Sequence, residues 1–478
     1  MERAALSLYS WFAININSTR KVYLFAGPGN NGGDGLALAR ILNENGYYVE
    51  VYYLFSKDYS ADFQINLNRL MKQAISIPVM ISKPEEFPTT EKDSIIVDAL
   101  FGSGLSRPLE GLSSEVVIKI NSSELPVISI DMPSGLFGEA NPIPNQNSVI
   151  KATTTLTLQF PKISFFFADS SGFVGSWVVI PIGLHPDAIS NMKTDYEVID
   201  DDCLSVQVNK RDTYSHKGNY GHCLIVSGSY GMIGAAVLAS NACLKAGAGL
   251  VTVHIPRSGN TILQCSVPEA IVDVDDNDWS FSSVTSLSKY SAIGIGPGLG
   301  KSHKSIAGFR ELLRKAIQPL VIDADALNII ADNPEFFRLI PTNTVITPHP
   351  GEFDRLFGKH SSEYERLVKA CNKAKELQII IVLKGAYTRV VTPDGRILFN
   401  STGNPGMATG GSGDVLTGII TSFLGQGNDP VSAAVSGVYV HGLAGDIASN
   451  QFGIESLTAT CIINCLGKAF NNLHGTIC

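Results

Sequence analysis

The segment Asn404–Asp414 combines a glycine-rich loop with a carboxylate at its end. Its glycines let backbone N–H groups approach an anion, because no Cβ stands in the way. The residues that follow, Val415–Leu424, carry apolar side chains at helical spacing. The sequence therefore predicts a loop at the amino end of a helix, where free N–H groups and the helix dipole favour a phosphate.

Anion binding alone does not explain an aspartate at position 414, since a bound anion would repel its carboxylate. A base that takes a proton from a hydroxyl beside a phosphoryl group would be placed there. A simpler alternative makes Asp414 the cap of the helix, which is a common use of aspartate. The segment by itself leaves both open.

Composition excludes several classes of function. The chain has 478 residues, of which 44% are hydrophobic and 17% charged, which is typical of a globular protein of about two to three domains. A net charge of −8 offers no basic field to a nucleic acid, so no nucleic-acid partner is expected. Eight scattered cysteines suit a reducing compartment. We find no signal-peptide pattern and no apolar run of the roughly 20 residues that a membrane helix needs, so we expect a cytoplasmic protein without a membrane partner.

Strand-like and helix-like segments alternate along the chain, the pattern of a doubly wound α/β sheet. A second α/β series begins after a polar stretch at Asp195–Tyr214, and we place the boundary near residue 205, with domains at 1–205 and 206–478. Helices are expected at Ala331–Leu339 and Glu363–Leu377. The expected strands are Lys21–Ala26, Tyr48–Phe55, Ser94–Asp98, Pro126–Asp131, Thr153–Phe160, Val174–Ile180, Gly221–Ser227, Leu250–Ile255, Ala292–Gly296, Leu320–Asp323, Val345–Thr347 and Ile379–Leu383.

Three segments match known ligand-binding motifs only in part. Gly27–Gly32 matches the G-x-G-x-x-G dinucleotide fingerprint, but the next strand runs into Ser56 and Lys57 rather than the acid that would hold a ribose. Gly296–Ser302 resembles a P-loop, yet its glycine spacing fails. His349 and Glu352 lie in one turn, but no further zinc ligands accompany them, and a hydrogen-bonded turn histidine is the plain alternative.

The second half carries a series of motifs in a fixed order: Ser215–Gly218, Gly228–Ala235, Gly296–Gly300, Thr347–Phe353, Lys384–Ala386 and Asn404–Asp414. This half resembles the ADP/ATP-dependent NAD(P)H-hydrate dehydratase domain. In the first half, Gly29–Gly35, Val97–Leu105 and Ile130–Gly135 resemble the NAD(P)H-hydrate epimerase domain. The two together are similar to the bifunctional NAD(P)H-hydrate repair enzymes of the YjeF type, and the similarity spans nearly the whole chain.

The resemblance implies both a fold and an activity. The fold is two tandem α/β domains, an N-terminal Rossmann-like doubly wound sheet and a C-terminal ribokinase-like domain. The substrates are NADHX and NADPHX, which are reduced nicotinamide cofactors hydrated at C6. The epimerase interconverts their R and S forms, and the dehydratase restores NAD(P)H from the S form with ADP as phosphoryl donor and Mg²⁺, releasing AMP and phosphate.

The resemblance also assigns residues in the dehydratase domain. Asp414 would deprotonate the C6 hydroxyl, while the N–H groups of Gly410–Gly413 stabilise the transferred phosphoryl group. A lysine at a sheet end in water is the alternative for Lys384. The implied nucleotide-binding residues are Lys384, Gly385, Ala386, Tyr387, Thr388, Asn404, Pro405, Gly406, Met407, Ala408, Thr409, Gly410, Gly411, Ser412 and Gly413. The implied substrate-binding residues are Ala235, Gly298, Gly300, His349, Pro350, Gly351, Glu352, Phe353, Asp354, Arg355 and Asp414.

In the epimerase domain the resemblance implies a potassium ion held by the side chains of Asn31, Asp98 and Ser134. Asp131 is the implied acid/base at C6, and an aspartate that caps a turn before Pro133 is its alternative. The implied substrate-binding residues are Asn30, Asn31, Gly32, Gly33, Asp34, Gly102, Ser103, Gly104, Leu105, Ser106, Arg107, Pro108 and Asp131.

Two departures bear on the epimerase. Members usually carry a helix before a Met-Glu-x-Ala sequence, and this chain starts at that sequence, so either the start codon is misassigned or the epimerase domain lacks its first helix. Its absence would weaken the homo-oligomer that we expect, or disturb the substrate site. Ser103 stands where a threonine is common, which is a mild change.

Two other functions remain open. The Gly-Ser-Gly-Asp loop also occurs in ribokinase-like kinases of small molecules, which release a stable phosphorylated product. The attached first domain argues against a kinase. That first domain is, in a third interpretation, a binding module without activity. The sequence decides neither between ADP and ATP nor between NADHX and NADPHX.

Overall fold

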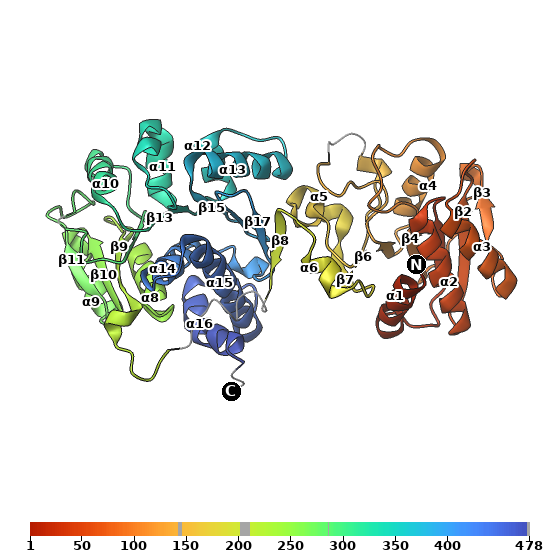
Figure 1. The fold of residues 1–478 in the computed structure, drawn as a ribbon, viewed down its shortest axis with the longest axis horizontal. Coiled ribbons are helices and arrows are strands. Elements are labelled where there is room, and N and C mark those ends of the chain that lie inside the picture. Colours follow the sequence, from red (N-terminus) through yellow and green to blue (C-terminus); the bar gives the residue numbers. More distant parts are fainter. Residues whose placement is uncertain (142–145, 201–210, 285, 476–478) are drawn as a thin grey trace. The chain divides into compact units, whose positions relative to one another are not determined.

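The computed structural model describes residues 1–141, 146–200, 211–284 and 286–475. It consists of two compact units, Met1–Lys193 and Thr194–Cys478 (Figure 1). The boundary expected near residue 205 lies outside the described residues. Each unit is built around one sheet, which agrees with the predicted pair of tandem α/β domains.

The first unit holds a seven-stranded parallel sheet in the order β3-β2-β1-β4-β5-β6-β7. The order reverses between β1 and β4, and such a switch point is where open α/β sheets bind ligands, beyond the carboxyl ends of the strands. The strands are β1 (Val22–Ala26), β2 (Val49–Leu54), β3 (Val79–Ile81), β4 (Ile95–Ala99), β5 (Val127–Ile130), β6 (Thr154–Leu158) and β7 (Ser176–Ile180). The helices are α1 (Glu2–Asn15), α2 (Asn30–Glu44), α3 (Ala61–Gln73), α4 (Gly111–Ser122), α5 (Ala168–Val174) and α6 (Pro186–Ser190).

Side chains of β1 alternate between two cores. Leu24 lies in the core that α1 and α2 cover, with Leu8 and Leu36, whereas Phe25 lies in the other core, with Val116 of α4. A strand buried on both faces reads as a continuous apolar run, which is why the sequence predicted these strands well.

The second unit holds a ten-stranded sheet in the order β11-β10-β9-β12-β13-β14-β15-β16-β17-β8. Its switch point lies between β9 and β12. The strands are β8 (Tyr196–Ile199), β9 (His222–Val226), β10 (Leu250–Ile255), β11 (Ile271–Val274), β12 (Ala292–Ile295), β13 (Leu320–Ile322), β14 (Val345–Ile346), β15 (Ile380–Leu383), β16 (Arg389–Val391) and β17 (Ile397–Asn400). The helices are α8 (Ile233–Lys245), α9 (Asn260–Ser266), α10 (His303–Lys315), α11 (Ala324–Asp332), α12 (Pro350–Phe357), α13 (Glu363–Leu377), α14 (Ser412–Gly425), α15 (Pro430–Phe452) and α16 (Ala459–Leu473).

The glycine-rich loop precedes α14, the helix that anchors it. Along α14 every residue from Val415 to Gly425 is buried, and the helix contacts α8, α15 and β12. Helices α14, α15 and α16 share one large apolar core with strands of the sheet. The amino end of α14 is therefore fixed at the carboxyl edge of the sheet.

Several sequence predictions need correction. The helix expected at Ala331–Leu339 is wrong, because α11 ends at Asp332 and Pro334–Leu339 form a 3₁₀ turn; Pro334 cannot continue an α-helix. The polar stretch that suggested a linker contains strand β8, which pairs with β17. Helix Glu363–Leu377 is confirmed as α13.

None of the helices in the described ranges is both long enough and apolar enough to cross a membrane.

Candidate active sites

Asp131 follows β5 and occupies the left-handed region, with φ of 67°. Aspartate tolerates this conformation better than most residues. Its Oδ2 accepts from the backbone N–H of Ser103 (3.2 Å), and its Oδ1 accepts from the backbone N–H of Leu158 (3.3 Å). One donor lies on the loop after β4 and the other at the end of β6, so the carboxylate joins separate strand ends instead of capping its own turn.

Lys162 forms an ion pair with Asp131. Its Nζ also donates to Thr157 Oγ1 (2.9 Å) and Phe160 O (3.2 Å), which fixes the ammonium group in place. The side chains of Lys162 and Asp131 are 15% and 11% exposed. The geometry of an ion pair with so little solvent exposure is more constrained than that of a surface salt bridge. The sequence analysis did not single out Lys162.

Asp98 is fully buried at the end of β4. Its carboxylate accepts from the backbone N–H of Leu100 (3.1 Å), from Ser129 Oγ (2.8 Å), and from the backbone N–H (2.9 Å) and Oγ (2.6 Å) of Ser134. Burial raises the pKa of Asp98, although these hydrogen bonds oppose the rise. All four of these donors are neutral groups.

Asn31 and Asp131 converge on Gly102. A Cβ built at Gly102 would lie 3.1 Å from Asp131 Oδ2 and 3.2 Å from Asn31 Oδ1. A side chain there would meet both polar groups, which accounts for the glycine. The Nδ2 of Asn31 is buried without a hydrogen-bond partner within the described residues. A buried polar group of this kind is costly unless a ligand or water satisfies it.

Asp34 completes the polar lining on α2. Burial, together with the negative charges of Asp131 and Asp62, raises its pKa to about 7. By contrast, Ser103, Ser106, Arg107 and Pro108 are exposed. The structure thus brings Asn31, Asp34, Gly102 and Asp131 together at the switch point and leaves 103–108 as an open loop beside them.

Asp414 is the third residue of α14, and Gly411 caps the helix with φ of 88°. The alternative in which Asp414 is the cap is therefore wrong. Burial, with repulsion from Asp323 and Asp325, raises the pKa of Asp414 to about 7, although Lys384 opposes the rise. A carboxyl group with such a pKa is matched to proton transfer near neutral pH.

Lys384 lies beside the glycine-rich loop. Its Nζ donates to Asp323 Oδ1 (2.8 Å) and lies 3.7 Å from Glu352 Oε2. Burial lowers the pKa of Lys384, but the carboxylates of Asp323, Glu352 and Asp414 outweigh it and raise the pKa. A Cβ built at Gly413 would lie 3.3 Å from this Nζ. The alternative of a lysine in open water is wrong.

His349 caps α12 with its ring. Its Nδ1 accepts from the backbone N–H of Gly351 (3.0 Å) and of Glu352 (3.4 Å), and the backbone N–H of His349 donates to Glu352 Oε2 (2.8 Å). Within the described residues no cluster of three or more metal-binding side chains occurs, here or elsewhere.

Two other predicted residues of α12 have internal partners. Phe353 is fully buried, and Asp354 is held by Arg366 and His360. Their predicted contact with substrate stays a prediction.

The glycine-rich loops after β9 and β12 lie against each other at the second switch point. Ser229 Oγ donates to Gly298 O (2.8 Å), and the backbone N–H of Gly300 donates to Asp325 Oδ2 (2.8 Å). A Cβ at Gly298 would lie 3.0 Å from that of Ala235. Three predicted substrate residues, Ala235, Gly298 and Gly300, are thus brought together near Asp325.

Hydrogen bonds join the loop Asn404–Gly413, which is predicted to bind the nucleotide, to α15. Asp446 accepts from the backbone N–H of Gly403 (2.8 Å) and from Asn404 Nδ2 (2.9 Å). His441 is buried and lies 3.3 Å from Ser412 Oγ, and burial lowers its pKa to about 4. These long-range contacts hold both ends of the loop.

Comparison with known proteins assigns the chain that carries these sites to a family. The model described as NAD(P)H-hydrate dehydratase matches residues 223–468, and the one described as YjeF-related protein N-terminus matches residues 1–164. A Bifunctional NAD(P)H-hydrate repair enzyme Nnr from Moorella thermoacetica is 36% identical over 472 residues, covering 96% of this chain and 88% of the relative. The chain belongs to this family of bifunctional NAD(P)H-hydrate repair enzymes.

Other family members and solved structures agree. The enzyme of the same name from Escherichia coli is 33% identical over 463 residues, covering 94% of this chain and 84% of its own length. An ADP/ATP-dependent NAD(P)H-hydrate dehydratase from Bacillus subtilis, crystallised with ATP and Mg²⁺, is 30% identical with a TM-score of 0.51, covering 58% of this chain and 98% of its own. A ribokinase-like superfamily protein from Enterococcus faecalis has a TM-score of 0.53 at 28% identity, covering 59% and 98%. The predicted family and the ribokinase-like fold of the second unit are confirmed.

Within this repair enzyme, sequence reasoning missed the acidic residues at the end of β13. Asp323 and Asp325 follow the apolar run Leu320–Ile322, and Ala324 between them has a left-handed φ of 49°. Two carboxylates directly after a buried parallel strand were the available signal.

Proposed function

We propose that this protein repairs hydrated nicotinamide cofactors in two units. The first unit interconverts the R and S forms of NADHX and NADPHX. The second unit dehydrates the S form with a nucleotide, ADP as donor, and releases AMP and phosphate. The observation that carries the proposal is the half-enclosed Asp414, which has a pKa of about 7 at the end of a glycine-rich loop.

Dehydration needs a better leaving group than hydroxide. Asp414 takes the proton of the C6 hydroxyl, and the oxygen attacks the terminal phosphorus of the donor, which expels AMP. The phosphate ester then leaves C6 with its electron pair as the N1 lone pair forms an iminium ion, and loss of a proton from C5 restores the C5–C6 double bond. Atoms and charge balance as NAD(P)H, AMP and phosphate.

Each neighbour of Asp414 has a role in this step. The N–H groups of Gly410, Gly411 and Gly413 would stabilise the transferred phosphoryl group, and Lys384, held by Asp323, would supply a positive charge beside it. Asp325 and Glu352 are the nearby carboxylates that would hold a Mg²⁺ ion arriving with the nucleotide, and such an ion would neutralise charge on the phosphates.

Epimerisation is assigned to Asp131 with Lys162. At a hydroxylated carbon attached to nitrogen, removal of the hydroxyl proton lets the C6–N1 bond open to an aldehyde, and closure on the opposite face inverts C6. Asp131 carries the proton, and Lys162 holds the carboxylate in a fixed orientation.

A potassium ion in the first site would be held by the carboxyl oxygens of Asp98, the hydroxyl of Ser134 and the amide oxygen of Asn31, since a hard monovalent cation prefers oxygen ligands. When bound, the ion supplies positive charge, and the protein residues orient the substrate. The homo-oligomer and the cytoplasmic location expected from the sequence remain predictions.

The test is incubation of the protein with S-NADHX and ADP or ATP, followed by absorbance near 340 nm. Recovery of the reduced ring with stoichiometric AMP from ADP, or ADP from ATP, supports the proposal, and the two rates rank the donors. A stable phosphorylated product without recovery would instead make the second unit a small-molecule kinase. Exchange of pure R-NADHX into S-NADHX in potassium, compared with lithium, tests the first unit in the same protein.

A further inference from the structure

An exposed pair of aromatic side chains lies beside the dehydratase site. Tyr230 and Trp279 are 67% and 56% exposed, and their rings meet edge to face with centroids 4.5 Å apart. The backbone N–H of Tyr230 donates to Trp279 O (2.8 Å). Large aromatic side chains are usually covered in a folded domain, so a fixed and exposed pair indicates a surface for a ligand.

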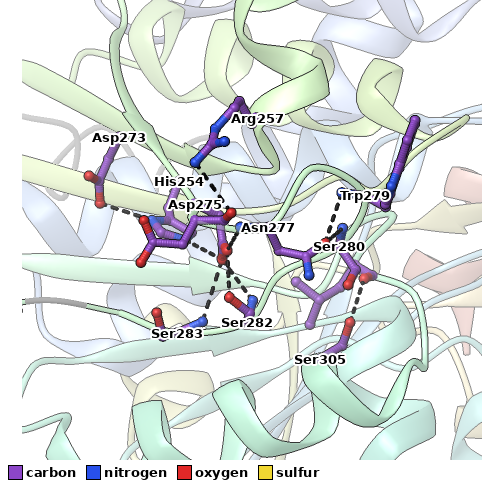
Figure 2. Close-up of polar contacts among 12 residues, drawn as sticks. His254, Arg257, Asp273, Asp275, Asn277, Trp279, Ser280, Ser282, Ser283 and Ser305 are labelled. Carbon is purple, nitrogen blue, oxygen red and sulfur yellow. Dashed lines mark hydrogen bonds and ion pairs between the residues drawn. The ribbon is translucent and has the colours of Figure 1, made fainter.

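A buried polar network holds Trp279 in place (Figure 2). Asp275 accepts from the backbone N–H groups of Asn277 (2.8 Å) and Ser282 (2.7 Å), and Asn277 Oδ1 accepts from the backbone N–H of Trp279 (2.9 Å). His254 lies between Asp273 and Asp275, at 2.9 Å and 3.0 Å. Burial lowers the pKa of His254, but the two carboxylates outweigh it and raise the pKa to about 9. The imidazolium is therefore charged at neutral pH and pairs with both carboxylates.

The same loop is bridged to both substrate loops. Tyr230 belongs to the turn whose Ser229 Oγ donates to Gly298 O. On the other side, Ser302 Oγ donates to Ser280 Oγ (3.2 Å) just after the Gly296–Gly300 loop. The aromatic pair is thus continuous with the segments that lead to Asp325 and Asp414.

The strand order separates this pair from the nucleotide. Tyr230 follows β9 and Trp279 follows β11, whereas Lys384 follows β15 and the Asn404–Asp414 loop follows β17. Asp323, at the end of β13, lies between them. At about 4.8 Å per strand, the edge from β13 to β9 and β11 spans roughly 10 to 20 Å, which an extended dinucleotide covers between its two bases.

We propose that Tyr230 and Trp279 form a stacking platform for the adenine base of the hydrated dinucleotide, at the end remote from the nicotinamide ring. The inference rests on the proposed dehydratase function and extends it to the distal half of the substrate. Aromatic side chains stack on any purine without hydrogen-bond readout, so the platform accepts NADHX and NADPHX alike. Binding energy from this remote base helps to hold C6 beside Asp414.

The test compares Trp279→Ala and Trp279→Phe in the full chain. With S-NADHX, Trp279→Ala should raise KM about tenfold with kcat changed much less, and Trp279→Phe should keep most of the affinity. With the hydrated form of reduced nicotinamide mononucleotide, which lacks the adenosine half, wild type and Trp279→Ala should have the same KM. The KM for ADP should also stay the same.

A matched control is Tyr214→Ala, since Tyr214 is 94% exposed and precedes the amino end of β9, away from the carboxyl edge. An unchanged KM for S-NADHX in Trp279→Ala would overturn the platform, and so would a rise in the KM for ADP, which would assign the rings to the donor. If the wild type dehydrates neither substrate, the proposed function itself fails, and this outcome is distinct from the other two.

Discussion

Lys384 donates to Asp323 at 2.8 Å, while Asp414 lies close enough for both to influence its pKa. The pair joins the ends of β15 and β13 beneath the glycine-rich loop. Asp323 thereby fixes the position of the Lys384 ammonium group, whose positive charge the transferred phosphoryl group needs. The same charge reduces the electrostatic repulsion between the carboxylates of Asp323 and Asp414.

Asp323→Asn should lower kcat for dehydration by roughly 10- to 100-fold, because the lysine loses its charged anchor and a preorganised contact in the transition state. Steady-state rates with S-NADHX and ADP measure this. Thr417→Val is the matched control, since Thr417 Oγ1 donates to the other oxygen of Asp323 (2.8 Å) and its loss leaves the lysine pair intact. Wild-type kcat in Asp323→Asn would rule out this role.

The pH dependence of dehydration follows from Asp414. Its pKa of about 7 lies above that of an ordinary carboxyl group because burial disfavours the charged form. The base must be ionised, so kcat/KM should be constant above about pH 8 and fall about tenfold per pH unit below about pH 6. A profile whose acid limb lies near pH 4 would show that Asp414 has an ordinary pKa.

The ionised carboxylate of Asp414 should also lower the free energy of unfolding. Its folded pKa is raised above its unfolded value, so its contribution favours folding at low pH and is lost as the pH rises from about 4 through about 7. Asp414→Asn should therefore raise Tm, and by more at about pH 8 than at about pH 5, with an effect on the order of 2–4 kcal/mol at the higher pH. Thermal melts of both proteins at the two pH values provide the measurement. A rise in Tm that is the same at both pH values would assign the gain to packing instead of charge.

The sequence predicted local features well and long-range pairings poorly. The glycine-rich loop and Asp414 stand within eleven consecutive residues, so their chemistry could be inferred from spacing alone. Asp323 lies 61 residues from Lys384, and Lys162 lies 31 residues from Asp131. The second carboxylate after the same strand was a signal for Asp323, but the partner of each residue could not be predicted, because only the folded sheet brings the partners together.

The sequence did not predict strands β8 and β16, for a related reason. Buried parallel strands such as β1 are continuous apolar runs, whereas β8 contains Glu197 and β16 contains Arg389. Each is short and sits toward one end of the sheet, where the pattern is weak.

Lys162 provides the clearest test of the first unit. Lys162→Met removes the ammonium group that holds Asp131, so exchange between R- and S-NADHX should fall by roughly 10- to 100-fold, whereas Lys162→Arg should retain part of it. Dehydration of S-NADHX should be unchanged in both variants, since that chemistry belongs to the second unit. Chiral separation of the epimers over time, with potassium present, measures the exchange.

Two further variants complete this experiment. Lys151→Met changes an exposed lysine of the same unit and should leave exchange at the wild-type rate, which controls for loss of charge. Asp131→Asn should abolish exchange while S-NADHX is still dehydrated. Asp131 accepts from two backbone N–H groups as well as from Lys162, so an amide at this position also meets donors that it cannot fully accept. Exchange that survives in Asp131→Asn would show that another group moves the proton, and Asp34, with its pKa of about 7, is then the next carboxylate in the same site.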